Sequence, residues 1–104
     1  MGFLAKIINI TDKLSNVKPV IIIGEKSYPV EDGMDVVMKF EELAAKSTSD
    51  ALKESIVLTL GKEAVEELNV SSWSLENFKV LTIAILAAVQ GVEYEEAASR
   101  FPGW

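Results

Sequence analysis

Three pairs of adjacent glutamates are the residues in this chain best suited to acid–base chemistry: Glu41-Glu42, Glu66-Glu67 and Glu95-Glu96. Two carboxylates can act as general acid and general base when both reach the same reacting group. Side chains of adjacent residues on a helix do not face one another, so neither member of such a pair supports the other. We therefore interpret the three pairs as solvated helix faces.

Two further patterns could suggest ion or phosphate binding, but neither is complete. Asp32 precedes Gly33, whereas a calcium loop needs a longer run of oxygen ligands, so we interpret the pair as a turn. Gly61-Lys62 follows no glycine-rich loop and is not a phosphate cradle. The chain also has no His and no Cys. Because these are common general bases, nucleophiles and metal ligands, we expect no enzyme, metal site or cofactor.

Composition limits the class of protein. The chain has 104 residues, of which 49% are hydrophobic and 25% charged, which predicts one domain spanning residues 1–104 with its own core. The net charge of −6 disfavours binding to nucleic acids and to anionic membranes. The opening MGFLAKIINI lacks the apolar core and cleavage site of a signal peptide. These features favour a cytoplasmic protein.

The longest apolar run predicts a central helix over residues 74–90. Ser74 is a good N-cap, and Gly91 can adopt the left-handed conformation that ends many helices. Between Val80 and Val89 the only polar residue is Thr82, so no face of the helix is left for water. The run is too short to span a bilayer. We expect the rest of the chain to cover this helix.

The elements expected around the central helix give an α+β fold, in which a β-hairpin precedes a small helical bundle. The N-terminal segment 3–10 fits either a helix or a short strand, and we expect it to be mobile or to depend on a partner. The hairpin is expected over residues 19–30, and the other helices over about 34–45, 50–60, 62–68 and 93–101.

The expected hairpin is apolar on both faces. With Glu25-Lys26 as the loop, Ile23 would face Tyr28 across the hairpin. Because side chains alternate along a strand, Val20 and Ile22 would then point to the face opposite Ile23. One face can pack on the helices. The other requires cover, either from the N-terminal segment or from another chain.

Several apolar residues thus remain without a clear role in the core. Trp104, at the C-terminal end of the sequence, is either docked at an interface or a chance terminal residue. An apolar groove or patch is what an amphipathic helix needs for binding. We expect these residues to form a protein-interaction surface and the chain to form homo-oligomers. The candidate interaction residues are Phe3, Leu4, Ile7, Val20, Ile22 and Trp104.

Four segments together resemble the small tail assembly chaperones of long-tailed phages and prophages of Gram-positive bacteria. The similarity extends over residues 7–101, and it rests on the order of the elements rather than on one specific motif. The segments are IINITDKLS, PVIIIGEKSYPVEDGMDVVMKFEELAAKST, LTLGKEAVEEL and NFKVLTIAILAAVQGVEYEEAASRF.

The resemblance implies a non-catalytic function. Such chaperones bind the tape measure protein, keep that long helical polypeptide soluble, and help to bring tail tube subunits to it. They leave before the tail is finished, so the protein is not expected in the mature virion. Two alternatives stay open. One is a small homo-oligomeric tail or connector subunit that remains in the particle, and the other is a regulatory or antitoxin-like dimer.

Overall fold

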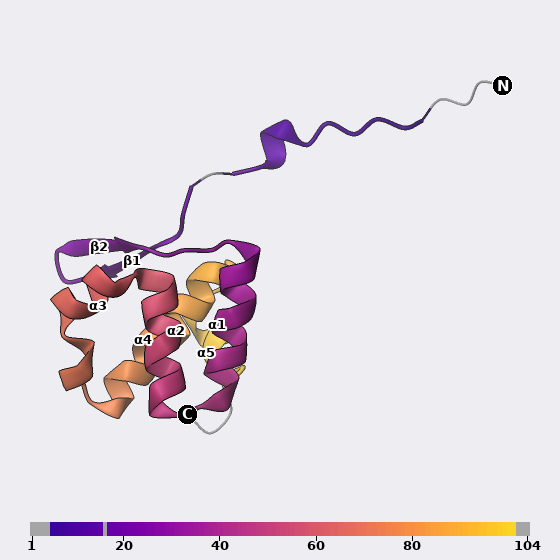
Figure 1. The fold of residues 1–104 in the computed structure, drawn as a ribbon. Coiled ribbons are helices and arrows are strands. Elements are labelled where there is room, and N and C mark those ends of the chain that lie inside the picture. Colours follow the sequence, from indigo (N-terminus) through magenta and orange to yellow (C-terminus); the bar gives the residue numbers. More distant parts are fainter. Residues whose placement is uncertain (1–4, 16, 102–104) are drawn as a thin grey trace.

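A two-stranded antiparallel hairpin precedes a bundle of helices in the computed structural model, which describes residues 5–15 and 17–101 (Figure 1). This arrangement confirms the predicted α+β fold. Short 3-10 turns lie at Thr11–Lys13 and Val70–Ser72. The strands and helices are β1 (Val20–Ile23), β2 (Lys26–Pro29), α1 (Met34–Lys46), α2 (Ser49–Leu60), α3 (Lys62–Leu68), α4 (Leu75–Gln90) and α5 (Tyr94–Ala98).

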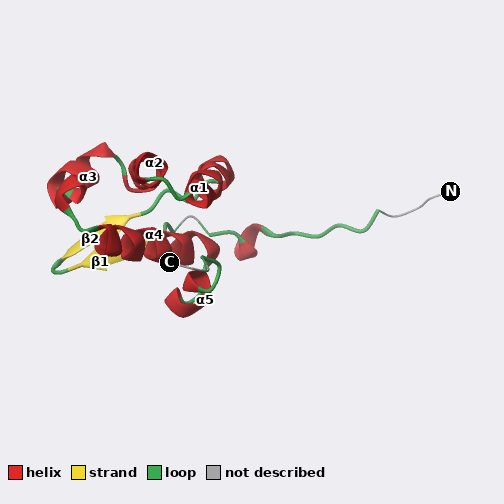
Figure 2. Cartoon of the chain, turned by 90° about the horizontal axis from the view of Figure 1, so that it is seen from below, coloured by secondary structure: helices red, strands yellow, loops and turns green. Residues whose placement is uncertain are grey.

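The elements form three layers. Figure 2 shows α1, α2 and α3 in a row on one side, the hairpin and α4 in the middle, and α5 on the other side of α4. The main core cluster joins these layers: Phe40 comes from α1, Ile56 from α2, and Leu81 and Ile85 from α4. Since α4 contributes the most residues to this cluster, it is the central helix that the sequence predicts.

Both predicted ends of α4 are confirmed. The Ser74 hydroxyl oxygen accepts a hydrogen bond from the Asn77 N–H (3.1 Å), and Gly91 ends the helix with a φ of 67°. The expectation that no face meets water is wrong for the N-terminal half, where Leu75 and Val80 are exposed. The hairpin is too narrow to cover this side, since no strand lies beyond β1 in the described parts of the chain.

The register of the hairpin differs from the prediction. Ile21 faces Tyr28 and Ile23 faces Lys26, so the loop is Gly24-Glu25 rather than Glu25-Lys26. Gly24 has a φ of 65°, the left-handed region that the first residue of a tight hairpin loop needs and that glycine enters without a Cβ penalty. The strand pairing thus shifts by two residues, and because side chains alternate with a period of two, each residue keeps its predicted face. Ile21 and Ile23 pack against the core.

Most predicted helices are confirmed within one residue, but the last is shorter. It covers Tyr94–Ala98 instead of 93–101, and its first residue, Tyr94, is exposed. Pro102 disfavours helical backbone at the residue before it, so the chain cannot continue this helix through Phe101. Phe101 nevertheless packs against the core.

The N-terminal arm, which we define as residues 5–15, has no helix or strand over residues 5–10 and projects away from the bundle (Figure 1). The radius of gyration is 17.0 Å, against about 13 Å for a compact domain of this length. Of the segment 3–10 that fitted either a helix or a strand, the described residues 5–10 form neither. None of the described helices combines the length and apolar character needed to cross a membrane.

Candidate protein-interaction surface

The outer face of β1 is apolar and uncovered. Its backbone alternates, so Ile21 and Ile23 turn toward the core while Val20 and Ile22 turn away from it. Ile22 is 72% exposed, and Val20 is also exposed. Neither the arm nor a helix covers this face. The second apolar face that the sequence predicts is therefore present and open.

The arm carries a second group of exposed apolar residues. Ile7 is 90% exposed, and Ile8, Ile10 and Leu14 are exposed as well. Of the six candidate residues, Phe3, Leu4 and Trp104 lie outside the described residues. The structure places the other three, Ile7, Val20 and Ile22, at the surface on the arm and on β1. It does not bring the arm and β1 into contact, and the binding role of all six stays a prediction.

An apolar groove of about 280 Å³ runs between β1 and α4, and we call it the β1–α4 groove. The Trp73 side chain is held there by a hydrogen bond from its indole N–H to the Leu68 carbonyl oxygen (3.1 Å). Asn77 is the one polar side chain among the lining residues, and none of them is charged. The lining residues are Ile21, Ile22, Ile23, Trp73, Asn77, Val80, Leu81 and Ala84.

Sequence reasoning missed this groove for a specific reason. Val80 belongs to an apolar run interrupted only by Thr82, and such a run does not reveal which of its members the fold leaves exposed. The signal that could have found it is the hairpin itself: two strands are a marginal sheet that commonly needs a third element. The exposed side chains of Val80 and Ile22 line the groove, which makes it suitable for binding an apolar segment of another chain.

A polar cluster links the hairpin to α3 away from the groove. The Lys26 ammonium forms an ion pair with the Glu67 carboxylate, and the Tyr28 hydroxyl donates to the same carboxylate (3.3 Å). The hydrogen bond from Lys26 holds the pKa of Glu67 below its ordinary value of 4.5, and the same bond raises the pKa of Lys26. Burial and the Glu67 charge raise the pKa of Tyr28.

Replacing Glu67 with glutamine should reduce stability at neutral pH by a small amount that disappears in acid. Because folding lowers the pKa of Glu67, its contribution is complete above its unfolded pKa near 4.5 and is lost as the pH falls through the lower native value. Urea unfolding at a series of pH values measures this difference between wild type and Glu67→Gln. Glu66→Gln removes the same charge from the neighbouring residue while leaving the ion pair between Lys26 and Glu67 in place, and it serves as the charge control.

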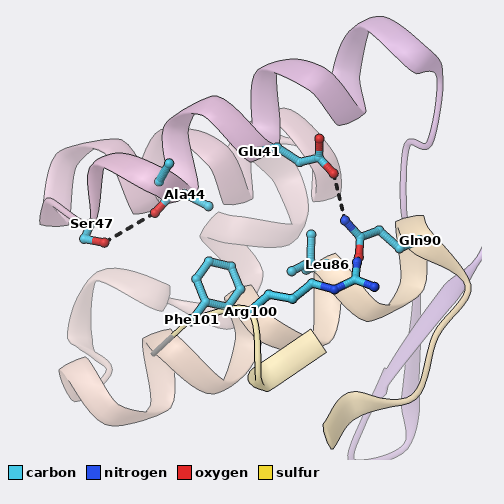
Figure 3. Close-up of a pocket in the computed structure, with 8 residues that line it drawn as sticks. Glu41, Ala44, Ser47, Leu86, Gln90, Arg100 and Phe101 are labelled. Atoms are coloured by element: carbon cyan, nitrogen blue, oxygen red, sulfur yellow. Dashed lines mark hydrogen bonds between the residues drawn. The ribbon is translucent and has the colours of Figure 1, made fainter. Parts of the chain in front are cut away.

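A second pocket lies where α1, the end of α4 and the segment after α5 meet (Figure 3). Across its mouth the Gln90 amide N–H donates to a Glu41 carboxylate oxygen (2.8 Å), and the Arg100 guanidinium donates to the Gln90 amide oxygen. Leu86 and Phe101 line its apolar part. Glu41 is already bonded to Gln90, and the Ser47 hydroxyl in the pocket donates to the Ala44 carbonyl oxygen (3.5 Å), so we interpret this chain of bonds as a structural tie.

The glutamate pairs are exposed, as expected for solvated helix faces. The sequence did not predict that Glu41 and Glu67 would each also bond to another element of the fold. Over residues 5–15 and 17–101 no cluster of three or more carboxylates is placed to hold a metal ion. Comparison of the chain with protein-family models, with curated proteins and with solved structures finds no match.

Proposed function

We propose that this protein is a phage tail assembly chaperone that binds apolar helical segments of the tape measure protein. The observation that carries the proposal is the open apolar surface made by the outer face of β1 and the β1–α4 groove, centred on Ile22. The resemblance over residues 7–101 supplies the identity of the cargo. In this role the protein acts in the cytoplasm of the bacterial host and also helps to bring tail tube subunits to the tape measure.

The binding mode follows from the chemistry of the surface. An amphipathic helix can lay its apolar face into a groove that has no charged lining residue. Burying one exposed isoleucine such as Ile22 contributes about 1.5–3 kcal/mol, so a few such contacts give an adequate but reversible affinity. Reversibility matters because a chaperone has to leave before the tail is complete.

The rest of the surface suits a protein that covers its cargo in many copies. The chain carries a net charge of −6, and like charge on the outside of a complex opposes aggregation between complexes. The groove is short compared with a long cargo helix. Each copy would therefore protect one segment, and protection would rise with the number of copies bound.

Co-expression with the tape measure protein from the same tail gene cluster should raise the soluble yield of the tape measure, and the two proteins should co-purify. The complex should survive moderate salt, since apolar contacts are screened far less than surface ion pairs. The measurement is the fraction of tape measure in the soluble extract and in the affinity eluate. Equal insolubility with and without this protein would contradict the proposal, as would dissociation by moderate salt.

A further inference from the structure

One edge of the hairpin is available for pairing. The Val30 N–H donates to the Pro19 carbonyl oxygen (2.8 Å), and the register continues from there to the pair Ile23 and Lys26. Hydrogen-bonded pairs alternate along an antiparallel ladder, so the N–H and C=O groups of Val20 and Ile22 point to the opposite edge of β1. The sheet has only β1 and β2 among the described residues, which leaves that edge unpaired.

The unpaired edge lies beside an apolar surface. The β1–α4 groove adjoins it, with Ile22 and Val80 both exposed. An exposed edge next to exposed apolar side chains is a template for another strand. A strand added there would bond to the backbone of β1, and alternate side chains would lie against Val80 and Trp73 in the groove.

The N-terminal arm has the properties of such a strand. Residues 7–10 read Ile-Ile-Asn-Ile, with three β-branched residues that favour strand geometry. In strand form Ile8 and Ile10 share one face, and Ile7 lies on the other. All three isoleucines are exposed here, and residues 5–10 make no helix or strand.

Charge favours the same pairing. Residues 5–15 contain two lysines and one aspartate, a formal charge of +1, which leaves −7 for the rest of the chain, the body, out of the total of −6. The arm is thus basic and the body acidic. Opposite net charges of this kind steer two copies toward arm-to-body encounters and disfavour body-to-body ones.

We propose that the arm of one copy adds as a third strand to the free edge of β1 in a second copy and fills its β1–α4 groove. The partner is a second copy because the arm points away from its own hairpin (Figure 1). Each copy both gives an arm and receives one at a different surface. Such a head-to-tail contact produces an open chain or a ring of copies rather than a closed two-fold dimer. The arm and a cargo helix would use the same groove, so the arm occupies it only in copies that carry no cargo. The pairing itself does not depend on the tail-assembly proposal.

Sedimentation of the full chain tests the pairing without any cargo. Wild type should form species larger than a monomer as concentration rises. The double variant Ile7→Pro/Ile8→Pro should weaken association about tenfold or more. In either register one of these two adjacent residues directs its N–H to β1, and the segment has no helix or strand to disrupt. The β-branched control Ile7→Val/Ile8→Val should associate nearly as wild type does. A wild type that stays monomeric, or association unchanged by the double proline variant, would overturn the proposal.

Disulfide trapping identifies which surfaces meet, because the chain has no cysteine of its own. Chains with cysteine at position 7, 8, 9 or 10 are each mixed with differently tagged Ile22→Cys chains and oxidised. The proposal predicts linked pairs of unlike chains with a two-residue alternation, from 7 and 9 or from 8 and 10, as strand geometry requires. A second set of chains carries Ile22→Cys together with one of the arm cysteines, and links that form only within these chains would place the arm on its own β1 and overturn the proposal. Absence of any arm-to-Ile22 link would overturn it as well.

Discussion

Leu81→Ala is expected to lower the free energy of unfolding by about 2–5 kcal/mol, the range for emptying a packed leucine site. Leu81 is 2% exposed and belongs to the cluster that joins α4 to Phe40, Ile56 and the hairpin. Its neighbours come from elements on both sides of the middle layer, so they cannot all move in to fill the space. Urea unfolding monitored by helical circular dichroism gives the measurement.

Leu75 provides a matched control on the same helix. It is 57% exposed, so the same substitution, Leu75→Ala, should change stability by about 0.5 kcal/mol or less. Comparing the two variants separates the effect of burial from the effect of replacing leucine by alanine in a helix. A loss below about 1 kcal/mol for Leu81→Ala would show that α4 is not the centre of the core.

Ile22→Lys should abolish most of the gain in soluble tape measure protein that the wild type gives on co-expression. Ile22 lies at the centre of the proposed contact, and binding there would bury the new ammonium group in an apolar surface at a large cost. The variant itself should fold normally because Ile22 contacts solvent rather than the core. Thermal unfolding of the purified variant checks this point.

Met38→Lys is the control for added charge. Met38 is 61% exposed on α1, away from the β1–α4 groove, so lysine there makes the same chemical change outside the proposed contact. This variant should support as much soluble tape measure as the wild type. Equal loss in both lysine variants would mean that charge, and not the β1 surface, controls the rescue.

Deleting residues 3–7 should reduce the gain in soluble tape measure protein if the arm also contacts the cargo.

The sequence was sufficient to predict the central helix because its signals are local. Ser74 and Gly91 mark the two ends, and the run between them has an unambiguous composition. The two faces of β1 were also predictable, because strand alternation assigns Ile22 to the face opposite Ile21 whatever the loop. These two features give the largest contribution of any one helix to the core cluster and one part of the candidate surface.

Features that depend on tertiary packing were not predictable in the same way. The predicted hairpin loop was displaced by one residue, which shifts the strand pairing by two residues and so preserves the same faces. Only the positive φ of Gly24 distinguishes the two loops. The β1–α4 groove exists because the two-stranded sheet leaves one side of α4 uncovered, and the amino-acid composition of α4 does not show which side that is. The bonds of Glu41 and Glu67 likewise join helices to elements distant in the sequence.

The most direct test of the proposed function is to quantify this protein, by mass spectrometry, in tape measure complexes isolated during assembly and in finished tails. The account predicts several copies for each tape measure protein in the assembly complexes and essentially none in finished tails, because the apolar cover is replaced as tube subunits enclose the tape measure. A stoichiometric amount in finished tails would contradict the account and identify the protein as a structural subunit of the tail.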